Sequence, residues 1–414
     1  MNVDFIFKLA LFLIPFDNLF FAPSAGWAAI SPMIFFVYLM LNLKQLKFLV
    51  FRKYQTKVAF ILFVLSYSFL LYFIYGVNFA NLADSLISLF LGIGCYMALV
   101  IRYVVKKNSI TKDLKVLLVG YKVGFVYGLI KVLALEANIG FILAVFKLIE
   151  KRYYDRLAFS FTEPSFISIH VFGILLLIFY LNKDKYIKKQ TGILILGYSA
   201  LTLISGGSGR FLVDVTVIFI IYILHKLFSS KINIKKKALS LALIMGFSVV
   251  FCNMIITNER VSLLLSQGVY SDPSTASRFF RINASIKGYE EEPVRALFGA
   301  GIGNAYKFLQ YGYSDALIEY KSSYKTEVIN LQYSKENQLF SMPIKVISEV
   351  GIVGFTILII VLFVFTKRHK GNMLALITIM WLYVQFDSLA FYSIWIYLFA
   401  TKYKVFDLDR RDKL

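Results

Sequence analysis

Long apolar runs separated by shorter polar segments dominate the chain. Windows of about 17 to 25 apolar residues recur from end to end, and each is long enough to cross about 30 Å of hydrocarbon as a helix. The runs lack the period-two alternation of a barrel strand, so helices are predicted. The pattern predicts about twelve transmembrane helices, over residues 5–16, 27–43, 58–76, 84–101, 116–134, 165–181, 191–205, 211–228, 238–257, 343–365, 372–386 and 388–401.

Composition agrees with this pattern. Of the 414 residues, 59% are hydrophobic and 17% are charged, and the mean hydropathy of +0.70 lies outside the usual range of soluble globular proteins. The predicted fold class is an all-α polytopic integral membrane protein. The first apolar run ends in FAPSAGW and is similar to a signal peptide, but Asp4 does not suit the basic start of one, and a first transmembrane helix explains the same residues.

The distribution of charge predicts the topology. Six loops together hold 27 Lys or Arg against five Asp. By the positive-inside rule these loops face the cytoplasm, as do both termini. The loops are residues 44–57, 102–115, 182–190, 226–237, 366–371 and 402–414. The net charge of +21 is therefore mostly a topology signal with attraction to anionic lipid headgroups, and nucleic acid is not an expected partner.

Two long loops with balanced charge are expected on the outer side. They carry four basic and four acidic residues in 135–164, and nine of each in 258–342. The first contains the pattern of an interfacial amphipathic helix, and the second opens a helix at Asp272 and Pro273. The predicted organisation is residues 1–134 with helices one to five, 135–164 as the first outer loop, 165–257 with helices six to nine, 258–342 as the large outer loop, and 343–414 with the last three helices and a cytoplasmic tail.

Arg210 is the first candidate for chemistry. It follows Gly206, Gly207, Ser208 and Gly209 between two apolar runs, at the expected outer mouth of the eighth helix. An arginine so close to a bilayer core is costly. A snorkelling arginine in a tight turn is one interpretation. A ligand site is favoured, because three glycines let a ligand approach the backbone closely and free N–H groups can face an anion.

A second candidate group is RLAFSFTEPSFISIH, at the outer entrance to the sixth helix. It contains Arg156, Glu163 and Ser165. Pro164 and Glu163 also suit an ordinary helix start, so a purely structural interpretation stays open. His170, further along, is expected to be a packed core histidine.

Arg278 and Arg281 form a third candidate pair in the large outer loop. Three residues apart on a helix, they share one face, and guanidinium groups suit bidentate binding of phosphate. A solvated basic face paired with Glu290, Glu291 and Glu292 is the alternative.

Further polar residues lie near or inside the later helices. Glu349, in ISEVGIVGF, has Lys345 four residues earlier, an arrangement that usually stabilises structure. Lys122, Asp214 and Asp387 are intramembrane charges that keep a transport role open. The three histidines, at 170, 225 and 369, are scattered, so no metal site or other cofactor is expected.

The order of four motifs resembles the bacterial O-antigen and capsule repeat-unit polymerases, the Wzy family, which is grouped with the O-antigen ligases. The motifs are FTEPSF before one helix, the Gly/Ser–Arg turn between two others, an arginine-bearing outer loop followed by LFGAGIGN, and ISEVGIVGF opening a late helix. The layout covers nearly the whole chain, although each motif is short.

The resemblance implies a GT-C-type membrane glycosyltransferase in the bacterial inner membrane, with its site on the periplasmic face. Its donor and acceptor would be oligosaccharides carried on undecaprenyl pyrophosphate, and a chain-length regulator and a flippase are candidate partners. On this basis Arg210 would stabilise the pyrophosphate leaving group. Arg156, Arg278 and Arg281 would bind the pyrophosphates, and Glu163 would be the general base.

One departure from the family favours a polymerase over a ligase. Ligases place a His-Asn pair shortly before the Glu-x-Gly of the late helix, whereas Glu336-Asn337 stands here at a longer spacing and no histidine occurs in 258–342. Ser165, Glu336, Asn337 and Glu349 are secondary site candidates. A flippase for lipid-linked oligosaccharide is the rival from another class, with Lys122, Lys131 and Lys345 as candidate cavity-lining residues.

Overall fold

The computed structural model describes residues 3–20, 29–49, 55–205, 208–228, 266, 268, 270–271, 273–320 and 326–404. This part of the chain is helical, and its one β-type contact is an isolated antiparallel bridge between Leu19 and Glu150. The expected ninth helix (238–257), Gly206, Gly207, Cys252, Asp272 and the tail after residue 404 lie outside the described residues.

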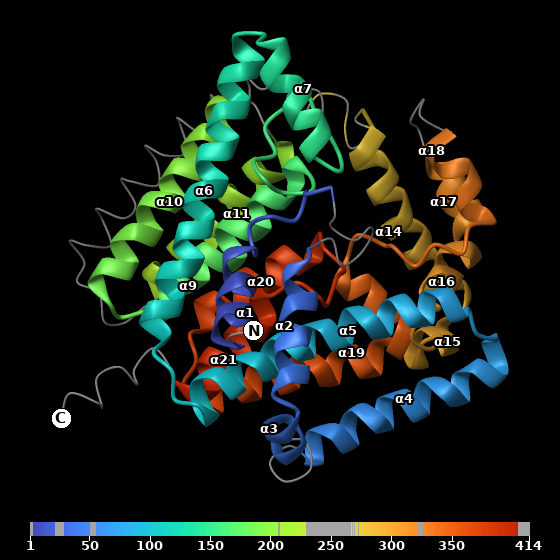
Figure 1. Ribbon diagram of the computed structural model, residues 1–414. Coiled ribbons are helices and arrows are strands. Elements are labelled where there is room, and N and C mark those ends of the chain that lie inside the picture. Colours follow the sequence, from blue (N-terminus) through green and yellow to red (C-terminus); the bar gives the residue numbers. More distant parts are fainter. Residues whose placement is uncertain are drawn as a thin grey trace.

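The N-terminal half contains α1 (Val3–Phe12), α2 (Ser31–Leu41), α3 (Leu43–Phe48), α4 (Gln55–Tyr75), α5 (Phe79–Val100) continued by a π turn (Ile101–Val105), α6 (Ile110–Glu136) and α7 (Gly140–Ile149). A 3₁₀ turn (Pro164–Phe166), α8 (Ile167–His170), a π turn (Val171–Leu175) and α9 (Leu176–Leu181) form one continuous rod, followed by α10 (Lys185–Ile204) and α11 (Gly209–Phe228). Figure 1 shows α6, α10 and α11 running steeply, while α4, α5 and α19 cross the view at a large angle to them.

The second half begins with α14 (Pro273–Glu291), α15 (Pro293–Phe298), α16 (Tyr306–Tyr311), α17 (Tyr313–Glu319) and α18 (Thr326–Ile329) with a 3₁₀ turn (Asn330–Gln332). The long α19 (Met342–Arg368), α20 (Met373–Val384) and α21 (Ser393–Tyr403) complete the described chain. The predicted helix start at Pro273 is confirmed, and the segment 258–342 contains several short helices among its described residues. They pack around a core of their own that includes Phe280, Leu309, Tyr313 and Leu339.

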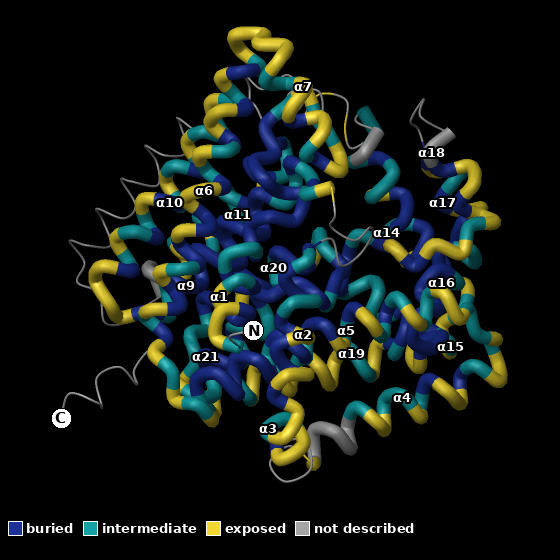
Figure 2. Tube along the Cα trace, in the orientation of Figure 1, coloured by how far each residue is buried: buried dark blue, intermediate teal, exposed yellow. Residues whose placement is uncertain are grey.

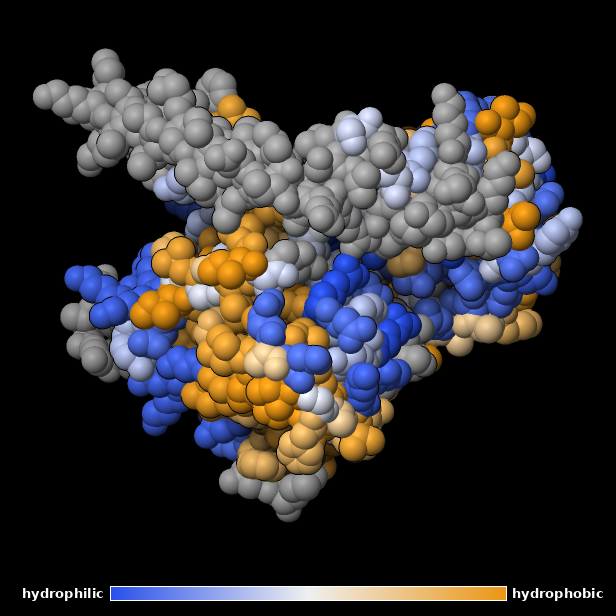
Figure 3. Space-filling view, turned by 90° about the horizontal axis from the view of Figure 1, so that it is seen from above, coloured by the Kyte–Doolittle hydropathy of each residue, from blue (hydrophilic) through white to orange (hydrophobic). Residues whose placement is uncertain are grey.

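Four helical segments of the described chain are long and apolar enough to cross a membrane: 79–105, 110–136, 164–181 and 342–368. At about 1.5 Å per residue the 27-residue segments reach about 40 Å. The three 27-residue segments carry exposed apolar side chains, many of them Val, Ile and Leu, whereas 164–181 is mostly buried. Figure 2 shows exposed positions along the outward faces of the helices, and Figure 3 shows a broad hydrophobic area bordered by hydrophilic residues. Such faces suit lipid, so the chain is a helical, membrane-embedded protein.

Several predicted boundaries need correction. The first helix ends at Phe12 instead of residue 16, ahead of Pro15, which disfavours helix in the residue before it. The seventh begins at Lys185 instead of 191, because the Asp184 side chain accepts from the N–H groups of Tyr186 and Ile187 and caps it. The twelfth begins at Ser393, five residues later than predicted.

The N-terminal segment belongs to the core of the fold. Ile6, Phe7, Ala10 and Leu11 are buried in α1, which packs against α2 and α6. The Ser31 hydroxyl donates to the carbonyl of Ala10 at 2.6 Å.

The motifs LFGAGIGN and ISEVGIVGF lie against each other. The N–H groups of Ala300 and Gly301 donate to the carbonyls of Ser348 and Glu349, at 2.8 and 2.9 Å. Gly351 has φ of 80° and kinks α19; a Cβ there would lie 2.1 Å from the Leu297 carbonyl oxygen, and one on Gly299 would lie 2.5 Å from that of Glu349. Glycine is therefore required on both sides of this contact.

Candidate functional site

Arg210 lies in the first turn of α11, where its side chain is nearly fully buried. Its Nε is 3.4 Å from Oδ2 of Asp214, one turn further along the same helix. Its Nη2 donates weakly, at 3.4 Å, to the carbonyl of Leu382 in α20. The other oxygen of Asp214 accepts from the indole N–H of Trp381 at 2.8 Å. The position of Arg210 is thus fixed by α11 and α20 together.

Glu163 brings two arginines from different segments together. Its Oε1 accepts from Nη1 of Arg152 at 3.0 Å, and its Oε2 lies 3.5 Å from Nη2 of Arg278 in α14. The Ser165 hydroxyl donates to the same Oε2 at 3.1 Å. Arg278 and Glu163 are both close enough to Arg210 to interact with it electrostatically. The structure therefore gathers Arg210, Glu163 and Arg278 at one place, although they are far apart in sequence.

Arg278 and Arg281 share one helix face, as predicted, and both stack on Phe340. Their guanidinium carbons lie 5.0 and 5.5 Å from the centre of that ring. Arg281 also pairs with Glu336 at 3.1 Å and donates to the carbonyl of Gln338 at 3.0 Å. The expected partners Glu290 and Glu292 pair with Lys287 and Arg295 instead.

Asp387 holds the backbone that carries Phe340 in place. Its Oδ2 accepts from the N–H groups of Leu339 and Phe340, at 2.9 and 3.0 Å. Phe340 has a positive φ of 56°, which is uncommon for a residue with a large side chain. The buried carboxylate thus stabilises the backbone conformation that presents the ring to both arginines.

Two guanidinium nitrogens in this region lack a well-aligned acceptor among the described residues, although Nε of Arg210 lies 3.4 Å from Oδ2 of Asp214. Within the part of the chain that the structure describes, the buried Nε atoms of Arg210 and Arg281 have no hydrogen-bond partner. An unsatisfied buried donor costs about 1–3 kcal/mol, so such groups are rare in native proteins and call for an explanation. A bound anion would supply the missing acceptors.

Asp17 and Asn18 hold the segments that carry Arg152 and Glu163. Oδ1 of Asp17 accepts from the N–H of Thr162 at 2.7 Å, next to Glu163. Asn18 donates to the carbonyl of Arg152 at 2.9 Å and accepts from its N–H at 3.1 Å. Two consecutive residues after α1 therefore set the relative position of the Arg152–Glu163 pair.

His170 is fully buried, as expected for a core histidine. Its Nε2 lies 3.2 Å from Oδ2 of Asp17, and its Nδ1 lies 3.0 Å from the hydroxyl of Tyr121. Phe161 stacks on the imidazole with ring centroids 4.1 Å apart. This packing ties the FTEPSF segment to α6 and α8.

Other predicted site residues lie in different places. Oε1 of Glu349 accepts from Nδ2 of Asn337 at 2.8 Å and from the N–H of Gly303 at 2.9 Å, so both side chains support the glycine contact described above. Arg156 stacks on Tyr154, 5.7 Å from the ring centre. No described contact joins these three residues to Arg210.

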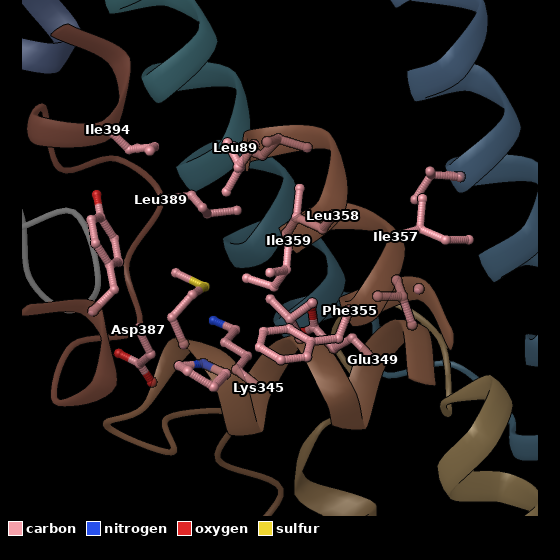
Figure 4. A pocket seen from close by; sticks show the side chains of 18 of the residues that line it. Leu89, Lys345, Glu349, Phe355, Ile357, Leu358, Ile359, Asp387, Leu389 and Ile394 are labelled. Atoms are coloured by element: carbon pink, nitrogen blue, oxygen red, sulfur yellow. The ribbon is translucent and has the colours of Figure 1, made fainter. Parts of the chain in front are cut away.

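A large, mostly apolar cavity of about 1040 Å³ adjoins the site. It lies between α4, α5, α19, α20 and α21, with Lys345 reaching into it from α19 and Asp387 and Glu349 at its edge (Figure 4). Trp381 and Asp387 link the cavity to the arginines, because both line it while bonding to Asp214 and to the Phe340 backbone. The candidate site therefore combines a group of arginines with an adjoining apolar cavity.

Sequence reasoning missed several members of this site. Asp214 and Asp387 were identified only as intramembrane charges, although Asp214 stands four residues after Arg210, a spacing that pairs side chains on a helix. Arg152 carried no signal that separated it from its basic neighbours. Phe340, Asp17 and Asn18 act through backbone contacts that a sequence does not display.

Comparison with known proteins gives no family for the chain. No protein-family model matches the sequence, and a search of curated proteins finds no match. Within the described residues, no group of three His, Cys, Asp or Glu side chains is placed to hold a metal ion.

Proposed function

We propose that this protein is a membrane glycosyltransferase that polymerises oligosaccharide repeat units carried on undecaprenyl pyrophosphate, as in the synthesis of O-antigen or capsule. The observation that carries the proposal is the gathering of Arg210, Arg278 and Arg281 from two separate segments; within the described residues, the buried Nε atoms of Arg210 and Arg281 make no hydrogen bond. A polyanionic headgroup fits this arrangement, and the adjoining apolar cavity suits its lipid chain.

The expected reaction joins two lipid-linked glycans. A hydroxyl at the non-reducing end of the acceptor attacks the anomeric carbon of the donor, and the bond from that carbon to the pyrophosphate oxygen breaks. The lipid pyrophosphate leaves with the electron pair, and the guanidinium groups stabilise its developing negative charge. Arg210 is the foremost candidate because it is the most deeply buried of the three and fixed between two helices.

Glu163 is the candidate acceptor of the hydroxyl proton. Both of its oxygens bind donors, from Arg152, Ser165 and Arg278. A substrate hydroxyl would therefore have to replace one of these donors, most easily Arg278 at 3.5 Å, whose guanidinium would move to the pyrophosphate. The Glu163–Arg278 ion pair would thus release Glu163 to act as a base only when the anionic ligand is bound.

The membrane placement that goes with this function is part of the proposal. It comprises about twelve transmembrane helices in a GT-C-like arrangement, a bacterial inner membrane, cytoplasmic termini and a periplasmic site. Substrate held in the outer leaflet would then meet Arg210, Arg278 and Glu163 at the membrane surface, with its polyprenyl chain in the cavity beside α19.

A flippase is less well supported by the described contacts. Of its three candidate cavity-lining residues, Lys131 is buried in an ion pair with Glu150, and only Lys345 lines the apolar cavity. A transport path would require cationic residues on both sides of the chamber.

Reconstitution tests the proposal directly. Purified protein in liposomes is mixed with undecaprenyl-pyrophosphate-linked repeat unit from the host strain, with no nucleotide, and the products are resolved on a gel. A ladder of chain lengths is expected. Movement of the unlengthened unit across the bilayer, without a ladder, would replace the polymerase with a flippase.

A further inference from the structure

A second, polar pocket lies away from the arginines, where the turn between α4 and α5 meets α16. Its volume is about 460 Å³. Residues from three segments line it: Tyr75, Gly76, Val77, Asn78 and Phe79 from the turn and its flanks, Tyr306, Lys307 and Gln310 from α16, and Lys335. The turn and the large outer loop thus build it together.

The pocket carries positive charge that no carboxylate of the described residues neutralises. Among the described residues, no carboxylate lies within ion-pair distance of Lys307 or Lys335. Burial lowers the pKa of Lys307, and the nearby cations Lys335 and Arg295 lower it further. A negatively charged ligand would relieve this repulsion, so the electrostatics favour an anion.

Hydrogen bonds to the backbone hold the walls of the pocket in place. Asn81 donates to the carbonyl of Lys335 at 2.6 Å, and Gln310 donates to that of Ser334 at 3.1 Å. Asn304 donates to the carbonyl of Gly76 at 2.9 Å. These bonds join all three segments, so the pocket is preformed.

One stretch of chain connects this pocket to the arginine site. Lys335 lines the pocket, Glu336 pairs with Arg281, and Phe340 lies beneath Arg278 and Arg281. Five residues span at most about 17 Å when extended. The pocket is therefore within reach of the sugars of a glycan whose pyrophosphate lies at the arginines.

We propose that this pocket binds a carboxylate-bearing sugar in the glycan of the lipid-linked substrate. The inference rests on the proposed function and adds to it that the repeat unit is acidic. Lys307 and Lys335 bind the carboxylate, and the rings of Tyr75 and Tyr306 offer amphipathic surfaces to the pyranose. The polar lining suits a sugar and not an acyl chain, which the apolar cavity accommodates.

Binding of a defined probe tests the pocket separately from catalysis. The probe is tetragalacturonate, titrated against the full-length protein in nanodiscs, with neutral maltotetraose as its counterpart. We expect saturable binding of the acid alone. The double variant Lys307→Gln/Lys335→Gln should bind at least tenfold more weakly, which corresponds to about 1.4 kcal/mol.

A matched control removes the same charge elsewhere on the outer part of the protein. The double variant Lys147→Gln/Lys287→Gln should bind the probe as the wild type does. Equal weakening in both variants, or displacement of the probe by inorganic phosphate at the same concentration, would overturn the assignment to a sugar. Gln310→Ala, which keeps all the charge, should also weaken binding if the pocket is the site.

The two proposals fail in different ways. If a ladder of products forms but tetragalacturonate does not bind, the pocket inference is wrong and the polymerase stands. If the probe binds in the pocket but no ladder forms, the acidic-sugar site stands without the polymerase.

Discussion

Two buried ion pairs in this protein are built in opposite ways. Lys131 and Glu150, which join α6 to the end of α7, are saturated: the ammonium lies 2.8 and 2.7 Å from the two carboxylate oxygens, and Tyr127 donates a third bond at 3.1 Å. Arg210 and Asp214 are 3.4 Å apart, and each keeps a buried atom without a hydrogen-bond partner among the described residues. The first pair is tightly bonded, whereas the second is a longer contact between those same two atoms, Nε of Arg210 and Oδ2 of Asp214, which do not form a well-aligned hydrogen bond.

The comparison separates structural charges from functional ones. A tightly bonded buried pair fixes the fold, because removing one partner leaves the other charge buried without compensation. A buried guanidinium whose Nε makes no hydrogen bond keeps a cost that an anionic ligand is expected to reduce on binding.

Replacing Arg210 should abolish the proposed activity. Arg210→Ala is expected to lower polymer formation at least about 100-fold, because a fixed charge at the leaving group is lost. Arg210→Lys should recover little, since a point charge does not reproduce the guanidinium fork. The measurement is the product ladder from liposomes.

Stability must be controlled in this experiment, because Arg210→Ala leaves Asp214 buried and unpaired. The double variant Arg210→Ala/Asp214→Asn should regain thermal stability while remaining inactive. Wild-type polymer formation in either variant would remove Arg210 from the site.

Replacing Lys131 should affect folding and not chemistry. Lys131→Met leaves Glu150 buried without its cation and is expected to cost about 3–5 kcal/mol of stability. Thermal unfolding in detergent measures the loss, and Lys131→Met/Glu150→Gln should recover much of it. If Lys131→Met were as stable as the wild type but inactive, the distinction between the two pairs would fail.

The scaffold of the Arg152–Glu163 pair gives a third, intermediate effect. Asn18→Ala removes two hydrogen bonds to the Arg152 backbone, for about 1–3 kcal/mol of stability. Polymer formation should fall roughly tenfold, because the Arg152 side chain is misplaced. In a protein that already carries Arg152→Ala, adding Asn18→Ala should cause no further fall, because there is no Arg152 side chain to misplace. Asn42→Ala, which removes a buried bond to the Tyr38 carbonyl, is the control and should lose stability alone.

An exposed pair provides the smallest effect. Hydrogen bonds from Asn283 and Lys287 lower the pKa of Glu319 below its ordinary value of 4.5. The stability that this carboxylate contributes is therefore present above pH 4.5 and is lost as the pH falls through its folded pKa. The melting temperature of Glu319→Gln should approach that of the wild type between pH 6 and pH 3.5, with a smaller difference at high salt. If the difference in melting temperature between the wild type and Glu319→Gln widened as the pH fell, the stabilising role of the Glu319 carboxylate would be contradicted.

The sequence was a good guide to elements and a partial guide to the site. Hydrophobic runs located most described helices, because burial in lipid imposes a length and a composition. Arg210 could be chosen because an arginine beside a bilayer core is costly, and Arg278 and Arg281 because their spacing places them on one helix face. Glu163 and Ser165 also suited an ordinary helix start, so local context alone did not decide their role. Phe340 and Asp387 could not, because their roles depend on a backbone conformation and on a contact between residues distant in sequence. Asn337 and Glu349 contact the glycine turn and not the arginines, and this too depends on tertiary contacts that the sequence does not display.

The interlocked glycines also have a consequence for how the protein is made. The turn at Ala300 and Gly301 is synthesised before α19, yet its N–H groups bond to carbonyls that α19 supplies. Until that helix has left the ribosome and entered the bilayer, the turn has no partner for these groups. The short helices beside this turn therefore complete their packing late, and insertion of α19 is the step that forms the contact.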